Sequence, residues 1–171
     1  RRNLLKAGAA AAAGIMASAA ANAGIPAAKV EKYDEEYDVV IIGSGFAGMA
    51  CALKAGRAGK KVLMLEKMPV VGGNSAICGG NVACPVNPVQ KAQGIKDSRE
   101  LFIADCLKDG LGLNHVELLS KIVDRCNDTI KFVEDCGAEF VPNHMLFEGG
   151  HSVPRSYEIK AGTGSGYIHP M

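Results

Sequence analysis

Residues 39–48 read Val-Val-Ile-Ile-Gly-Ser-Gly-Phe-Ala-Gly, and this stretch decides the fold. Its four apolar residues predict a buried strand, and its glycines predict a sharp turn from that strand into a helix. Gly43 permits the turn because it has no Cβ to restrict the backbone angles. Gly45 lets a diphosphate approach the backbone, and Gly48 lets the helix pack closely on the strand. The stretch therefore predicts a βαβ unit with a diphosphate at the N-terminal end of its helix.

A carboxylate follows the second predicted strand of this unit. Lys61–Leu65 has a strand-like pattern, and Glu66 comes directly after it, eighteen residues beyond Gly48. At this position an acidic side chain accepts hydrogen bonds from ribose hydroxyls, and it disfavours a 2′-phosphate. Strand, glycine turn, helix and acid together predict a bound dinucleotide, but they do not distinguish NAD from FAD.

The sequence beyond Glu66 distinguishes the two cofactors through a family resemblance. Residues 66–75 read Glu-Lys-Met-Pro-Val-Val-Gly-Gly-Asn-Ser. With four other segments they resemble the flavoproteins of the fumarate reductase and succinate dehydrogenase type, in particular the periplasmic flavocytochrome c branch. These other segments are residues 38–48, 78–81, 110–114 and 149–155. The resemblance runs from about Tyr37 to the C-terminus.

The resemblance implies an α/β fold, a Rossmann-like FAD-binding domain with a parallel sheet and helical additions. It implies FAD as the cofactor. The predicted FAD contacts are Gly43, Gly45, Ala47, Gly48, Glu66, Lys67, Gly73, Asn74, Ser75, Gly79 and Gly80. Glu66 is expected to bind the adenosine ribose, and Gly73–Ser75 to lie along the diphosphate and flavin. Gly79 and Gly80 are expected to let the isoalloxazine ring meet the substrate, since only small residues let backbone contact a flat ring.

The same resemblance implies an oxidoreductase that reduces the C=C bond of fumarate or a similar enoate with electrons from a multihaem cytochrome c. Such a reaction needs hydride from the flavin, cationic groups to hold the carboxylate and a proton donor. In the family an arginine donates the proton, and we expect the catalytic residues downstream of Met171. Predicted substrate contacts within the chain are Gly80, His151 and Arg155. The alternative for the last two is a structural loop in which Arg155 pairs with a carboxylate.

We interpret residues 37–171 as the N-terminal part of the FAD-binding domain, ending before the capping domain that binds substrate. The chain starts at Arg1 without an initiator methionine, whereas members of the family run to several hundred residues. The second half of the FAD site is expected beyond Met171. This part of the protein is therefore expected to be inactive alone.

The N-terminus resembles a twin-arginine export signal. Residues 1–6 read Arg-Arg-Asn-Leu-Leu-Lys, and an uncharged, alanine-rich stretch follows up to Ala23, where Ala-Asn-Ala offers a cleavage site. We predict a signal peptide at 1–23, a linker at 24–36 and a periplasmic location. An amphipathic helix or a membrane anchor is the alternative, but alanine contributes little transfer energy, so no stable membrane span is expected.

The composition fits one soluble domain and gives no reason to expect nucleic acid, covalent haem or a metal ion as a partner. Of the 171 residues 48% are hydrophobic and 22% charged, and the net charge of +1 gives no reason to expect nucleic acid. The six cysteines form no CxxC or CxxCH motif, which excludes covalent haem within these residues and disfavours zinc. No histidine has a second ligand at metal spacing, so no metal is predicted. The cysteines are expected to be single buried thiols, except Cys78, which falls beside the expected flavin.

Secondary structure is predicted as follows. A helix covers Phe46–Ala58 and closes at Gly59. A long segment, Val70–Gln93, wraps FAD, and Pro85 and Pro88 prevent a regular element in its second half. A second helix starts at Ser98 and stops at Gly110. The remaining predictions are a helix capped by Asn114 with Glu117, and another short helix from Asn127 or Asp128 through Val133 that ends near Gly137.

Two other functions stay open from the sequence. One is a related flavin enzyme for another substrate, such as methacrylate or urocanate, or a dehydrogenase that works in the oxidative direction. The other is an inactive, truncated flavoprotein segment. No residue between 37 and 171 discriminates these from a fumarate reductase.

Overall fold

The computed structural model describes residues 33–171. The chain divides into two units, Arg1–Glu36 and Tyr37–Met171, and the following description concerns the second. The predicted signal at 1–23 and residues 24–32 of the predicted linker lie outside the described residues. Within the described part of the chain, no helix is both long and apolar enough to cross a membrane.

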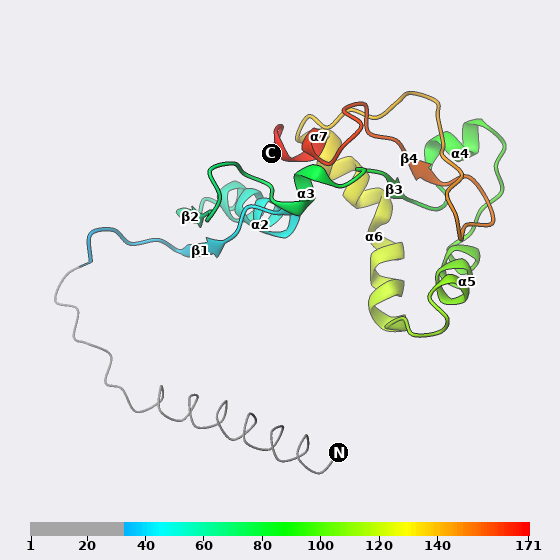
Figure 1. Cartoon of the computed structure of the whole chain (residues 1–171), viewed down its shortest axis with the longest axis horizontal. Coiled ribbons are helices and arrows are strands. Elements are labelled where there is room, and N and C mark those ends of the chain that lie inside the picture. Colours follow the sequence, from blue (N-terminus) through cyan, green and yellow to red (C-terminus); the bar gives the residue numbers. More distant parts are fainter. Residues whose placement is uncertain (1–32) are drawn as a thin grey trace, which may run out of the picture. The chain divides into compact units, whose positions relative to one another are not determined.

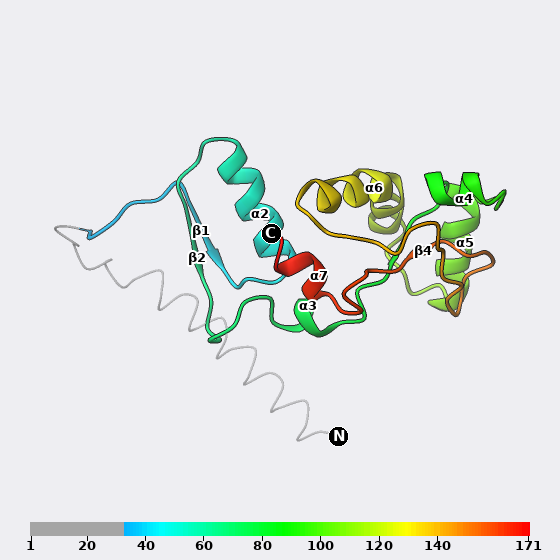
Figure 2. The same cartoon turned by 90° about the horizontal axis from the view of Figure 1, so that it is seen from above.

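The second unit begins with the predicted βαβ arrangement: β1 (Val39–Ile42), α2 (Phe46–Arg57) and β2 (Val62–Leu65). The two strands are parallel, and their register pairs Val39 with Val62 and Ile42 with Leu65. Helix α2 packs against both strands (Figures 1 and 2). As predicted, Gly59 terminates the helix, with a φ of +74°. Because the strands run in register, the residues that follow them lie side by side.

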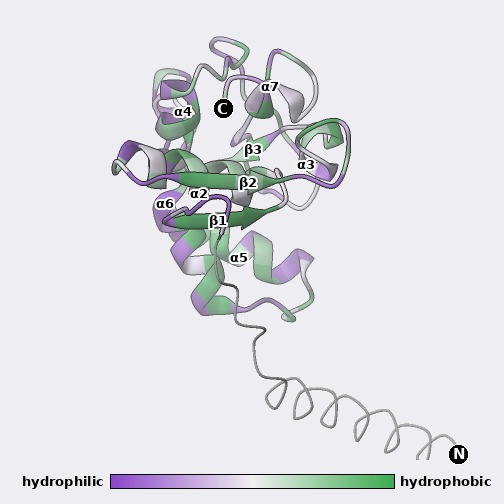
Figure 3. Cartoon of the chain, turned by 90° about the vertical axis from the view of Figure 1, so that its left-hand side faces the viewer, coloured by the Kyte–Doolittle hydropathy of each residue, from purple (hydrophilic) through white to green (hydrophobic). Residues whose placement is uncertain are grey.

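The strands β1 and β2 are apolar along their whole length (Figure 3). Strand geometry sends successive side chains to opposite faces. Ile41 is buried, on the face that α2 covers, whereas Val40 and Ile42 point the other way and are exposed. An apolar run of this kind is typical of strands that are covered on both faces in parallel sheets.

The prediction that the second half of Val70–Gln93 lacks regular structure is wrong. The segment contains α3 (Asn74–Ile77), β3 (Val82–Ala83) and α4 (Pro88–Ala92). Proline suits the first position of a helix, where its missing N–H is not needed, so Pro88 begins α4. Asn87 and Gln90 cap this helix reciprocally, each side chain accepting a hydrogen bond from the backbone amide of the other.

Helix α5 (Arg99–Asp109) has the predicted ends. Ser98 Oγ accepts a hydrogen bond from the Leu101 amide at 3.0 Å, and Gly110 follows the last turn. The predicted break at Asn127 or Asp128 is wrong, because α6 runs unbroken from Val116 to Asp135. Neither residue type forces a helix to end, and the apolar face continues across them. The buried side chains of α6 are Val123, Cys126, Ile130 and Val133.

Asn114 does not cap α6, contrary to the prediction. The N-cap is His115, which makes no side-chain capping bond. The Asn114 side chain instead lies over Gly110, where a Cβ would be 2.2 Å from its Oδ1. That oxygen is buried without a hydrogen-bond partner among the described residues. The Asn114 side chain thus packs on Gly110, at the end of α5, and not on the first turn of α6.

Two apolar clusters form the core. The first lies between α5, α6 and β4 (Ser156–Tyr157), which pairs antiparallel with β3. It contains Cys84, Phe102, Val123, Cys126, Ile130, Met145 and Tyr157. The second joins the end of α6 to α7 (Ser165–Ile168) and contains Val133, Ala138, Ile159 and Tyr167.

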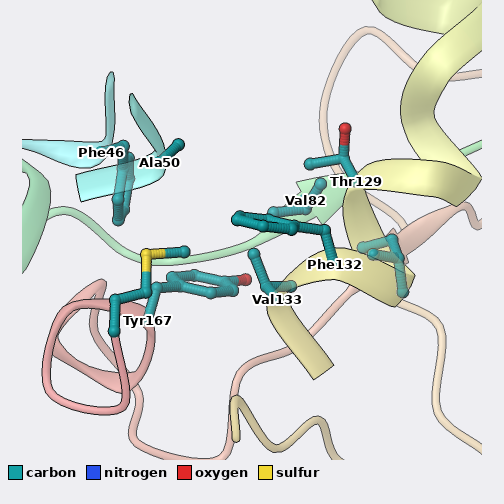
Figure 4. Close-up of a pocket in the computed structure, with 9 residues that line it drawn as sticks. Phe46, Ala50, Val82, Thr129, Phe132, Val133 and Tyr167 are labelled. Atoms are coloured by element: carbon teal, nitrogen blue, oxygen red, sulfur yellow. The ribbon is translucent and has the colours of Figure 1, made fainter. Parts of the chain in front are cut away.

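An apolar pocket of about 190 Å³ lies beside the second cluster, between α2, β3, α6 and α7 (Figure 4). Phe46, Phe132 and Tyr167 contribute rings to its lining, and the Thr129 hydroxyl is a polar group at its wall. Among the side chains of residues 33–171, the Tyr167 phenol is the only ionisable group in its lining. We therefore assign it no chemistry.

Candidate cofactor-binding site

The glycine turn between β1 and α2 has the geometry that the sequence predicts. Gly43 adopts a φ of +96°, which residues with a Cβ rarely adopt, and its amide donates to the Leu65 carbonyl at 2.8 Å. At Gly48 a Cβ would lie 2.2 Å from the Gly43 carbonyl oxygen. The first turn of α2 can therefore rest on the loop that leads into it only because position 48 is glycine.

Ser44 fixes the orientation of Glu66. The Ser44 amide donates to Glu66 Oε2 at 2.9 Å, and the Ser44 hydroxyl donates to the same oxygen. Ser44 Oγ in turn accepts a hydrogen bond from the Gly72 amide at 2.8 Å. Ser44 is fully buried. The Ser44 hydroxyl thus links the residue that follows β2, Glu66, to the glycine pair Gly72–Gly73.

Glu66 is held in its ionised form. Its Oε1 accepts from the Met68 amide at 2.8 Å. The hydrogen bonds from Met68 and from the side chain and amide of Ser44 lower the pKa of Glu66 from 4.5 to about 2. An ionised carboxylate can only accept hydrogen bonds, which is what a pair of ribose hydroxyls requires. A phosphate at the same place would be repelled.

Ser75 lies at the N-terminal end of α2. Its Oγ accepts a hydrogen bond from the Phe46 amide at 3.1 Å, and a Cβ on Gly45 would lie 3.2 Å from the same oxygen. The next amides, those of Ala47 and Gly48, belong to the first turn, where a helix has no internal acceptors. No acidic side chain occupies this first turn. The positive end of the helix dipole is therefore free to attract an anion.

Gly79 and Gly80 are adjacent but differ in their surroundings. Gly80 is buried with a φ of +75°, and a Cβ there would lie 2.6 Å from Ile159 Cγ2. Its carbonyl accepts a hydrogen bond from Tyr167 Oη at 2.5 Å. Gly79 is exposed, and a Cβ there would meet no atom of the described part of the chain within 4 Å. Gly80 is thus required by the fold, whereas the space in front of Gly79 is open.

Residues 162–166, Gly-Thr-Gly-Ser-Gly, form a glycine run near the C-terminus that packs against α3 and the residue after it. A Cβ on Gly164 would lie 1.9 Å from the Ser75 carbonyl oxygen, and the Gly164 amide donates to the Cys78 carbonyl at 2.8 Å. This contact holds α3 against α7 and so supports Ser75. The sequence reasoning missed this role of Gly164, as it missed Ser44 and Tyr167. The only signal in the sequence for the contact of Gly164 is the glycine run itself, since glycine lets two backbone segments approach closely.

His151 and Arg155 belong to a different part of the unit. The Arg155 guanidinium is fully buried and pairs with Asp97 through Nη2 at 2.9 Å and with Asp105 through Nη1 at 2.6 Å. Nη1 also contacts His151 Nδ1 at 3.0 Å, and the guanidinium carbon lies 4.7 Å from the Phe102 ring centre. Arg155 is thus paired with carboxylates, the alternative that the sequence left open.

Asp105, one of the two carboxylates of this buried network, is held in its ionised form. Burial acts to raise its pKa, but hydrogen bonds from the side chain and amide of Ser152 and from Arg155 outweigh it and lower the pKa to about 2. Of this group, His151, Ser152 and Asp105 line a polar cavity of about 370 Å³ together with Lys108. The predicted substrate contacts of His151 and Arg155 stay predictions.

The residues predicted from the βαβ unit fit a dinucleotide. Gly43–Gly48, Glu66 and Ser75 meet at the carboxyl ends of β1 and β2, where ligands bind in sheets of this type. The helix end can hold a diphosphate and the carboxylate a ribose. The other predicted contacts that face solvent, and so leave room for a ligand, are Ala47, Lys67, Gly73, Asn74 and Gly79.

Comparisons with known proteins agree with this geometry. A family model described as "FAD binding domain" matches residues 38–169. The acrylate reductase flavoprotein subunit of Shewanella woodyi is 42% identical over 172 residues, which cover 100% of this chain and 34% of that protein. A "Fumarate reductase (cytochrome)" of Shewanella frigidimarina is 36% identical over 129 residues, 75% of this chain and 22% of that protein.

A solved structure shares the fold. The open conformation of a flavocytochrome c3 fumarate reductase matches with a TM-score of 0.73 at 30% identity, over 82% of this chain and 25% of that one. The chain therefore spans about a third or less of the length of these relatives.

Proposed function

This chain belongs to the FAD-binding domain family that includes the fumarate-reductase-type flavoproteins, and from this membership we propose that it is the FAD-binding portion of an exported enoate reductase. The proposed reaction is reduction of the C=C bond of fumarate or a similar enoate, with electrons from a cytochrome c. The observation that carries the proposal is the 42% identity to an acrylate reductase flavoprotein subunit along the whole chain.

The residues of the chain position FAD in this proposal. The first-turn amides of α2 and the dipole of that helix hold the diphosphate, with Ser75 completing the turn. Glu66, ionised and oriented by Ser44, accepts hydrogen bonds from the hydroxyls of the adenosine ribose. Gly79 leaves the space through which the ring and the substrate approach the backbone. Bound FAD supplies the hydride for the double bond.

Acrylate and fumarate are both α,β-unsaturated carboxylates, and the chain is similar to reductases named for each of them. The match to the acrylate reductase subunit extends over the predicted export signal, whereas the match to the fumarate reductase covers 75% of the chain. The carboxylate-binding residues and the proton donor are expected beyond Met171. Methacrylate, urocanate and the oxidative direction remain the alternatives.

Substrate assays on the whole protein test the reaction. The purified protein should show a flavin absorption spectrum and should oxidise a reduced viologen dye when acrylate, fumarate, methacrylate or urocanate is added. Reduced cytochrome c in place of the dye tests the electron donor. The proposal fails if FAD is bound but none of these enoates accepts electrons, or if only the saturated acids are oxidised.

Gly79 gives a direct probe of the cofactor. Because a Cβ at this position meets no atom of residues 33–171 within 4 Å, Gly79→Ala should leave the unfolding midpoint of the apoprotein unchanged. If the flavin or substrate contacts this glycine, the same variant should lower FAD affinity or turnover. Equal FAD affinity and turnover in variant and wild type would remove Gly79 from the site.

Export can be tested separately. Replacement of both Arg1 and Arg2 by lysine should leave the protein in the cytoplasmic fraction, because the twin-arginine route requires the pair. A variant that still reaches the periplasm would contradict the proposed route and would leave the reductase proposal untouched.

A further inference from the structure

Tyr167 on α7 contacts two of the segments that are proposed to hold FAD. Its exposed fraction is 4%. The Tyr167 hydroxyl donates to the Gly80 carbonyl at 2.5 Å, and the Tyr167 ring meets the Phe46 ring edge to face, with 5.6 Å between the ring centres. Both rings line the apolar pocket of Figure 4. Gly80 belongs to the segment proposed for the flavin, whereas Phe46 begins α2, where the diphosphate is proposed to bind.

The Tyr167 hydroxyl fixes the backbone of the glycine pair Gly79–Gly80. Within residues 33–171, no other hydrogen bond reaches the backbone amide or carbonyl of either glycine. Gly80 has a φ of +75°, and glycine has a wider choice of backbone angles than any other residue. The conformation of the pair therefore depends on this one donor more than it would in a segment of ordinary residues.

Tyr167 is itself held firmly. The Gly164 amide at the start of α7 donates to the Cys78 carbonyl at 2.8 Å, and the Tyr167 ring also packs on Phe140, 6.0 Å away between ring centres. Burial raises the pKa of Tyr167, so the hydroxyl keeps its proton at neutral pH and remains a donor. The side chain can thus act as a rigid link between the two segments.

We propose that Tyr167 is a positioning residue for the flavin. Its hydroxyl holds Gly79–Gly80 in the conformation that receives the isoalloxazine ring, and its ring keeps this pair in a fixed relation to the turn at Phe46. Tyr167 acts through the Gly80 backbone and not by contact with the reacting atoms. The inference rests on the proposed function, because it requires FAD to lie along both segments.

The expected effect follows from preorganisation. A segment that is already ordered binds its ligand more tightly, because binding does not have to order it. Without the hydroxyl, Gly79–Gly80 can leave the binding conformation. The loss cannot exceed what the hydrogen bond contributes, so FAD affinity should fall by about 2- to 10-fold. The adenosine half of the site, with Glu66 and the first turn of α2, keeps its contacts.

The test is a comparison of FAD and ADP binding to the apo form of the whole protein. ADP fills the ribose and diphosphate half of the site and does not reach Gly79–Gly80. Tyr167→Phe keeps the ring and removes the hydroxyl, so the dissociation constant for FAD should rise by about 2- to 10-fold while that for ADP stays unchanged. A merely structural role would weaken both ligands alike. Isothermal titration calorimetry measures both constants.

Tyr157→Phe is the matched control. Tyr157 on β4 is also buried and also packs on Phe140, with 5.0 Å between the ring centres. Its hydroxyl has no hydrogen-bond partner among the described residues. Its removal should therefore leave the dissociation constants for FAD and ADP as in the wild type.

Hydrogen exchange of the wild-type protein tests the same link without a variant. Opening of α7 would release Gly80 and with it the flavin, so FAD should slow amide exchange at residues 165–168 as well as at 78–82. Slower exchange at 78–82 alone would overturn the proposal. So would a Tyr167→Phe variant that binds FAD as the wild type does, or one that loses FAD and ADP affinity equally.

The wild-type spectrum separates this proposal from the proposed function. A wild-type protein that binds no flavin overturns both. A wild-type protein that binds FAD and reduces an enoate, next to a Tyr167→Phe variant with the same FAD affinity, overturns the role of Tyr167 alone.

Discussion

A Cβ placed on Gly48 would lie 2.2 Å from the carbonyl oxygen of Gly43, so α2 rests directly on the turn that precedes it. Real Cβ atoms do not approach backbone oxygen this closely, and neither group is the end of a flexible side chain. We expect Gly48→Ala to lower the free energy of unfolding by about 1–3 kcal/mol, as for other overpacked sites. Urea unfolding followed by circular dichroism measures the change.

Gly56 in the same helix is the control for this variant. A Cβ at Gly56 meets no atom within 4 Å, and alanine is favoured over glycine in a helix by about 0.5–1 kcal/mol. Gly56→Ala should therefore be neutral or stabilising. If the two variants unfold at the same urea concentration, the close packing of Gly48 on Gly43 does not matter for stability.

Glu66 should make the protein sensitive to acid. Its pKa is lowered to about 2 in the folded state, first by the Met68 amide and then by Ser44, so the unfolded state binds a proton more readily. This contribution to stability is present above the ordinary glutamate pKa of 4.5 and is lost as the pH falls toward 2. Glu66→Gln should flatten the dependence of the thermal midpoint on pH in this window.

Two further variants sharpen this measurement. Ser44→Ala removes the hydroxyl donor and should raise the pKa of Glu66, which carbon-detected NMR titration can follow. Glu134→Gln changes an exposed glutamate of α6 and should leave the pH dependence as in the wild type.

In the whole protein, Glu66→Ala should weaken FAD binding about tenfold or more, since hydrogen bonds to a charged group are lost. Equal FAD affinity would contradict the ribose assignment.

The local part of the site could be predicted from the sequence. A glycine turn, an apolar strand and an acid at the end of the next strand are separated by short stretches of chain, and their physical requirements are visible in residue type. The Rossmann-like fold class and FAD as the family's cofactor are confirmed by the family match at 38–169.

The supporting contacts could not be predicted because they join segments far apart in the chain. In the sequence Ser44 looks like an ordinary turn residue, because Glu66 comes to lie beside it only when β1 and β2 pair. Gly164 looks like an ordinary loop residue, because its contact with Ser75 forms only when α7 packs against α3. The unbroken α6 has the same cause. Burial of Ile130 and Val133 outweighs the local preference of Asn127 and Asp128 for a helix start.

Gly80 and Gly79 should respond differently to the same substitution. At Gly80 the backbone has a φ of +75° and a Cβ would lie 2.6 Å from Ile159 Cγ2 and 2.9 Å from the Thr163 carbonyl carbon. Gly80→Ala should cost about 1–3 kcal/mol of unfolding free energy, whereas Gly79→Ala should cost little. Chemical denaturation of both variants checks this. A stable Gly80→Ala would show that the segment can shift away from Ile159.

Arg155 should be required for folding because two buried carboxylates depend on it. Its partners Asp97 and Asp105 lie 58 and 50 residues earlier in the chain, and the guanidinium is fully buried between them. Arg155→Met leaves both carboxylates without their cation and should destabilise the protein by about 3–5 kcal/mol. Arg99→Met is the matched control, because Arg99 pairs with Asp124 on the surface and its loss should change stability little.

The pH dependence of the Arg155 variant separates a structural role from a substrate contact. In the wild type the pKa of Asp105 is lowered to about 2, so its contribution to stability is lost as the pH falls from about 4 toward 2. Without Arg155 the pKa of Asp105 should rise, and the variant should lose less stability than the wild type over this window. A variant that unfolds like the wild type but no longer turns over enoate would instead assign Arg155 to the substrate.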